Sequence, residues 1–157
     1  MEYILAALIM GIFATATIDV WAEILGRGFK LPTTNWAMVG RWFGHLPKGR
    51  FIHKPISASP EIANELTVGW VLHYLIGIVY AFMYLSLVES NPELMTALAF
   101  GVVTVLVPWF VLQPGLGFGC VARLAPKPRM VRMINLSMHS IFGVALYAGW
   151  LLSELVI

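Results

Sequence analysis

The chain has 157 residues, of which 59% are hydrophobic and only 11% are charged, with a formal net charge of +2. A soluble domain is usually about half apolar and a quarter charged, so this composition excludes an ordinary soluble domain. Nucleic-acid binding is a poor explanation of the charge, because the basic residues are clustered and suit anionic lipid headgroups. Cys120 is the one cysteine, which excludes an intramolecular disulfide and a zinc-binding cysteine cluster.

Four apolar stretches are each long enough to cross a bilayer as a helix, which takes about 20 residues. The first stretch ends at the break Gly26-Arg27-Gly28. The second and third follow Ser59-Pro60-Glu61 and Asn91-Pro92-Glu93, in which a proline at the first helical position precedes an acid. Pro108 should kink the third helix. The expected spans are residues 3–25, 60–88, 92–113 and 131–155.

The distribution of basic residues predicts the orientation of these spans. All ten Lys and Arg lie within residues 27–54 and 123–132, and such residues accumulate in cytoplasmic loops. We therefore expect cytosolic loops at 26–59 and 114–130, with both termini and the turn at Ser90 outside. The predicted fold is all-α: one domain, residues 1–157, forming an integral membrane four-helix up-and-down bundle.

The first cytosolic loop is too long to be a simple connection. Thr34 and Asn35 can cap a helix, and Trp36, Val39 and Phe43 then fall on one helical face. This pattern predicts a short amphipathic helix in the inner membrane interface, or a lid over the cytosolic mouth of the bundle. The residues expected at lipid headgroups are Arg41, Lys48 and Arg50.

Several strings resemble one known family. NWAMVGRWFGHLPKGRF, residues 35–51, is similar to the hallmark of a bacterial membrane-protein family catalogued as domain of unknown function number twenty-nine thirty-eight. ATATIDVWAEILGRGF, GWVLHYLIGIVYA and TVLVPWFVLQPGLGFG extend the similarity over nearly the whole chain. The resemblance implies a multi-span protein of the bacterial inner membrane. It implies no established activity, so no catalytic residue is assigned and enzyme activity stays open.

Ionisable residues within the apolar spans are the best candidates for a functional site, because such groups are costly in hydrocarbon and usually face the bundle interior. Asp19 and Glu23 are one helical turn apart and share a face. Counted from the helix ends, Asp19, His73 and His139 each lie roughly 10 Å inside the cytosolic boundary. Three helices are therefore expected to present protonatable groups to one layer.

That layer permits several functions. Asp19, Glu23, His73 and His139 could bind an iron, zinc or manganese ion, or His73 and His139 could hold a b-type haem. A proton-coupled small-molecule carrier or relay is the alternative, and would need a homodimer or larger complex because four spans are few. A structural accessory subunit of a membrane complex is the third reading. The residues expected to orient ligands or cover the site are Thr15, Tyr80, Tyr147, Gln113, Trp42 and His45.

The two halves of the chain also share a pattern. His73, Gly77 and Tyr80 in the second span correspond to His139, Gly143 and Tyr147 in the fourth. Gly11 and Gly101 occupy the middle of the first and third spans. An internal repeat of two helices, with its axis along the membrane normal, would explain this pattern.

Overall fold

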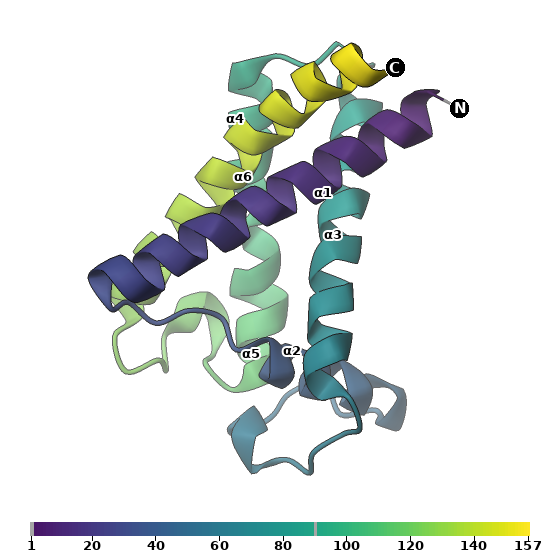
Figure 1. Cartoon of the computed structure of the whole chain (residues 1–157). Coiled ribbons are helices and arrows are strands. Elements are labelled where there is room, and N and C mark those ends of the chain that lie inside the picture. The colour runs from purple at the N-terminus through teal and green to yellow at the C-terminus, as the bar shows by residue number, and fades with distance from the viewer. Residues whose placement is uncertain (1, 90) are drawn as a thin grey trace. The chain divides into compact units, whose positions relative to one another are not determined.

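The computed structural model describes residues 2–89 and 91–157, and every regular element there is helical (Figure 1). Four helices are long and apolar enough to cross a membrane. They are Glu2–Gly28, Glu65–Leu87, Leu94–Leu116 and Pro128–Val156. Each overlaps one of the four expected spans, whereas Ser90, which marks the expected outer turn, lies outside the described residues. By its internal contacts the chain divides into two compact units.

Unit 1 comprises the chain up to Thr33 together with residues His73–Thr104 and Leu136–Ile157. Within this unit the two ends of the chain lie at the same side (Figure 1). Its elements are α1 (Glu2–Glu23), a π-helical turn (Ile24–Gly28), most of α3 (Glu65–Leu87), α4 (Leu94–Thr104) and most of α6 (Pro128–Val156).

Glycines allow the helices of unit 1 to approach one another closely. A Cβ atom added to Gly11 of α1 would lie 2.5 Å from the Cα of Ile78 in α3, and one added to Gly101 of α4 would lie 2.5 Å from the Cα of Gly143 in α6. Small residues are the usual means of close helix packing in membranes, where lipid is as apolar as a leucine side chain. These contacts therefore set which faces of the helices meet.

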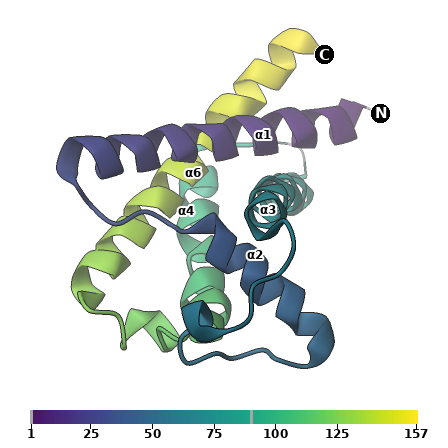
Figure 2. The same ribbon diagram turned by 60° about the horizontal axis from the view of Figure 1, so that its bottom comes forward.

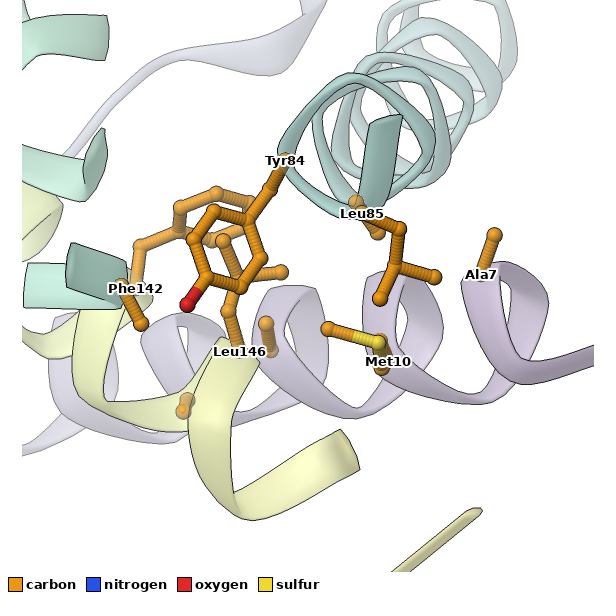
Figure 3. Close-up of a cluster of buried hydrophobic side chains, with 10 residues drawn as sticks. Ala7, Met10, Tyr84, Leu85, Phe142 and Leu146 are labelled. Atoms are coloured by element: carbon orange, nitrogen blue, oxygen red, sulfur yellow. The ribbon is translucent and has the colours of Figure 1, made fainter. Parts of the chain in front are cut away.

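A cluster of buried apolar side chains fills the centre of unit 1 (Figure 3). Tyr84 and Leu85 of α3 cluster with Met10 of α1 and with the α6 residues Phe142 and Leu146. Tyr84 is 1% exposed, yet its hydroxyl is satisfied: it contacts the Thr96 hydroxyl at 2.9 Å and donates to the Glu93 carbonyl. The start of α4 is thereby tied to α3.

Unit 2 comprises residues Thr34–Leu72 and Val105–Asn135. The helix predicted in the first loop is present as α2 (Trp36–His45), and the Asn35 side chain caps it by accepting from the Met38 amide at 3.3 Å. Its location at a membrane interface stays a prediction. The helix containing Pro108 departs from regular α geometry, since a π-helical segment, Pro108–Leu112, leads into α5 (Gln113–Leu116). The kink expected at Pro108 stays a prediction.

The first turns of α3 and α2 lie across each other (Figure 2). Gly40 of α2 faces the Glu65 carbonyl, and Gly69 of α3 faces the Trp36 carbonyl, with no room for a Cβ atom at either glycine. Backbone therefore touches backbone at this crossing.

Two expectations for this region are wrong. The second span begins at Glu65 rather than at residue 60, because a 3₁₀ turn (Ile56–Ala58) and the irregular residues after it provide groups that bind Arg41. Arg41 itself does not reach out to headgroups: it is 4% exposed and forms a two-pronged ion pair with Glu65, at 2.8 and 2.7 Å. The helical periodicity placed Arg41 outside the apolar face but could not show that a loop covers it.

Candidate functional site

Two of the predicted site residues meet within unit 1. His73 of α3 places its Nε2 atom 2.9 Å from Oδ1 of Asp19 in α1. The neighbouring Tyr74 donates its hydroxyl to the other carboxylate oxygen, Oδ2, at 2.9 Å. Both oxygens of Asp19 thus accept a hydrogen bond from α3, and the two spans are joined by a carboxylate, an imidazole and a phenol.

These side chains are largely removed from solvent. The Asp19 side chain is 23% exposed and that of His73 is 10% exposed. A carboxylate in such a position requires hydrogen-bond donors, because an uncompensated charge in an apolar span is costly. The pair carries one negative charge when His73 is neutral and no net charge when one further proton is bound. Taking up or releasing a proton therefore changes the charge of this site.

Glu23 does not join this cluster. It forms an ion pair with Arg27, four residues later, and both side chains are more than half exposed. Arg27 belongs to the π-helical turn that ends the first span, one helical turn after Glu23. A carboxylate with an exposed basic neighbour one turn away has no need of a buried partner.

His139 lies in a different environment. Its Nδ1 atom is 2.8 Å from the Thr104 hydroxyl, which in turn donates to the Gly101 carbonyl or to the ring. Thr104 is 6% exposed, and it closes α4 just before the helix is interrupted. His139 thus joins α6 to α4, as His73 joins α3 to α1.

The residues expected to orient ligands have other contacts. The Thr15 hydroxyl donates to the Gly11 carbonyl at 2.7 Å. Tyr80 packs edge-on against Phe100 and Phe142, and the ring of Tyr147 packs against Trp150. In unit 2, Gln113 donates to Oδ1 of Asn135 at 2.6 Å.

The two residues assigned to a lid, Trp42 and His45, belong to α2. The Trp42 indole packs against Gly115 and donates to the Phe51 carbonyl at 2.9 Å. His45 is 2% exposed. Both are thus bound within unit 2, and their role as a lid stays a prediction.

The four predicted metal ligands are not assembled into a binding site. Within residues 2–89 and 91–157, no group of three or more His, Cys, Asp or Glu side chains is placed to hold a metal ion. Asp19 and His73 bind each other, while Glu23 and His139 have partners of their own. The geometry therefore gives no support to a metal or haem site made from these four residues.

Sequence reasoning missed Tyr74 and the hydroxyl of Thr104. Tyr74 directly follows His73, and adjacent residues on a helix point in directions about 100° apart. A search for one helical face therefore excludes it, although the long phenol reaches the same carboxylate. A search for ionisable residues also passes over the neutral hydroxyl of Thr104. The signals available in the sequence were Pro108, four residues after Thr104, and His73, directly before Tyr74.

The fold and the cluster together define a class of protein: an all-helical chain with four helices long and apolar enough to span a membrane, two of which share an ionisable site. The chain belongs to the family described as Protein of unknown function (DUF2938), whose model matches residues 8–153. This confirms the resemblance found in the sequence. No curated protein and no solved structure matches the chain.

Proposed function

We propose that the protein is a multi-pass protein of the bacterial cytoplasmic membrane in which Asp19 and His73 exchange protons, as a relay or as the coupling site of a small-molecule carrier. One observation carries the proposal: a carboxylate in one apolar span accepts hydrogen bonds from an imidazole and a phenol of another. Ionisable groups inside membrane spans are typical of proton relays and ion pathways.

The chemistry of the pair supports this proposal. Imidazole gains or loses a proton near neutral pH, unlike most side chains. A proton taken up by the pair removes its net charge, and a cationic substrate binding at Asp19 would have the same effect. Competition between a proton and a cation for one carboxylate is a simple basis for coupled exchange. A carrier of four spans would work as a homodimer.

The test is proton flux into liposomes that contain the purified protein and an internal pH-sensitive dye, driven by a potassium diffusion potential. We expect flux in the wild type and at least about a hundredfold slower flux in Asp19→Asn, the lower end of what a positioned acid or base usually contributes. Asp19→Asn retains the shape of the side chain, so size-exclusion chromatography should show a folded protein.

Glu23→Gln is the matched control, because it removes a carboxylate one turn away that is exposed and paired with Arg27. Its flux should equal that of the wild type. Flux that is indifferent to Asp19→Asn would contradict the proposal. A wild type without flux, together with a loss of thermal stability in Asp19→Asn, would instead favour a structural role in an accessory subunit.

A further inference from the structure

A pocket of about 390 Å³ opens in unit 1, at the side where the two ends of the chain lie (Figure 1). Three helices line it: Glu2 and Tyr3 come from α1, Leu85 comes from α3, and Trp150 and Glu154 come from α6. Pockets of about 300 to 1,000 Å³ are the size that small molecules occupy. The chemistry of these side chains indicates what kind of molecule would bind.

Both charged side chains of this pocket are acidic, and the chain places no basic group beside them. Glu2 and Glu154 are exposed and form no ion pair with any residue that the structure describes. All ten Lys and Arg lie within residues 27–54 and 123–132. Arg27, the nearest of them to Glu2 in sequence, is roughly 37 Å away along the helix at 1.5 Å per residue. The complement of this negative pocket is therefore a cation that the chain does not supply.

Two aromatic side chains line the same pocket and are held in position. Tyr3 packs edge-on against Phe82, with ring centroids 5.1 Å apart, and its hydroxyl contacts the Ser86 hydroxyl at 2.7 Å. Trp150 packs against Tyr147, with ring centroids 5.9 Å apart. The faces of aromatic rings attract organic cations, and Trp does so most strongly. Aromatic rings beside carboxylates suit an ammonium group that carries carbon substituents.

A metal ion matches this pocket less well. Calcium takes six to eight oxygen ligands, and within residues 2–89 and 91–157 no three His, Cys, Asp or Glu side chains are grouped to hold an ion. Leu85, which also lines the pocket, is 2% exposed and belongs to the apolar core of unit 1. Apolar lining favours the carbon groups of an organic cation over the water that a metal ion with few protein ligands would retain.

We propose that this pocket binds the ammonium group of a small organic cation, with Glu2 and Glu154 compensating its charge and with Tyr3 and Trp150 contacting its carbon substituents. The ammonium group belongs either to a free solute or to the headgroup of a zwitterionic lipid, because both present the same chemistry. Binding here requires no proton exchange at Asp19. It is measured directly, so its failure is distinguishable from a failure of proton flux.

The first experiment measures binding of radiolabelled choline, a small quaternary ammonium compound, to the wild type in maltoside detergent by equilibrium dialysis. We expect saturable binding of one choline per chain. Dimethylbutanol, the neutral isostere in which carbon replaces the nitrogen, should displace it at least about tenfold less well than unlabelled choline, because it has the shape without the charge. Absence of saturable binding, or equal displacement by the two compounds, would overturn the proposal without any variant having to fold.

Substitutions then locate the bound choline. Glu2→Gln and Glu154→Gln each remove one charge at nearly constant volume, and each should weaken binding by about fivefold, the upper end for an exposed ion pair. Trp150→Leu should weaken it by a similar factor through the loss of one ring. Glu93→Gln is the matched control, because Glu93 is an exposed carboxylate of unit 1 that does not line the pocket. A control variant as weak as Glu154→Gln would show a response to surface charge only and would overturn the proposal.

Two nanodisc compositions distinguish the two sources of the ammonium group. Half of the lipid in both is phosphatidylglycerol, which matches the surface charge, and the other half is either phosphatidylethanolamine or a glycolipid without an amine. Equal choline affinity in the two membranes would support the pocket as a site for a free cation. Weaker affinity with phosphatidylethanolamine would support it as a site for a lipid headgroup, since the lipid amine then competes with choline.

Discussion

Arg41 is the charged residue on which the most interactions of unit 2 converge. Its guanidinium binds Glu65 with two nitrogens, Glu61 with one, and the carbonyls of Ser57 and Ser59. Hydrogen bonding to Glu65 raises the pKa of Arg41 above its ordinary value, so the group stays charged. A buried cation is tolerated only where its donors are matched in this way.

Replacing one partner of this ion pair should therefore destabilise the protein. Glu65 is 16% exposed at its side chain, and Glu65→Gln would leave the Arg41 charge incompletely compensated. We expect the free energy of unfolding in detergent to fall by about 3 kcal/mol, the lower end for breaking a buried ion pair. Chemical or thermal unfolding followed by circular dichroism measures this loss.

Glu61→Gln provides the comparison, because the Glu61 side chain binds the same guanidinium but is 83% exposed. Solvent screens such a pair, so its loss should cost less than about 1 kcal/mol. Equal effects of the two substitutions would mean that Arg41 is not buried as described.

At the scale of helices, contacts at glycine determine which side chains meet. Gly77 and Gly143 each lie one turn after a histidine, and each faces a neighbouring helix with no room for a Cβ atom. His73 then reaches Asp19 on α1, and His139 reaches Thr104 on α4. The parallel between the two helix pairs agrees with the internal repeat, which stays a prediction.

A methyl group at one of these crossings should separate the helices. In Gly143→Ala the new Cβ atom would lie 2.5 Å from the Ala97 carbonyl oxygen, and backbone cannot yield cheaply. We expect a loss of about 2 kcal/mol, typical of overpacking. Gly28→Ala, which has no atom within 4 Å of the added methyl group, should leave stability nearly unchanged. Thermal unfolding of the two variants compares them, and a neutral Gly143→Ala would contradict the described contact.

At the scale of the whole molecule, the positions of the basic residues determine the orientation we propose. Seven of the ten Lys and Arg lie between the first and second apolar helices or between the third and fourth. The other three, Arg27, Arg129 and Arg132, lie near the ends of those helices that border the same two stretches. Translocation of such loops is disfavoured, so both should be cytosolic and both termini outside.

Cys120 allows this orientation to be tested without adding a label site. It is free and exposed, in the second expected cytosolic loop, residues 114–130. A membrane-impermeant maleimide should modify it in inverted membrane vesicles and leave it unmodified in intact spheroplasts. Ile157→Cys in a Cys120→Ser background should show the opposite pattern. Modification of Cys120 in spheroplasts would refute the orientation.

The candidate site was predictable only in part. Asp19 and His73 were identified because an ionisable residue in an apolar helix is a local feature of the chain. Depth along the helix then suggested that His139 and Glu23 belong to the same site. Depth does not specify rotation about the helix axis, and it is rotation that directs His139 toward Thr104 and leaves Glu23 beside Arg27.

The sequence by itself determined the four apolar helices and the capped helix α2, because each depends on residues within one segment. Only the tertiary structure decided that Asp19 pairs with His73 and that Arg41 is covered by residues 57–61. Those contacts join segments far apart in the chain. They depend on how closely two backbones approach, and glycine contacts between helices set that distance.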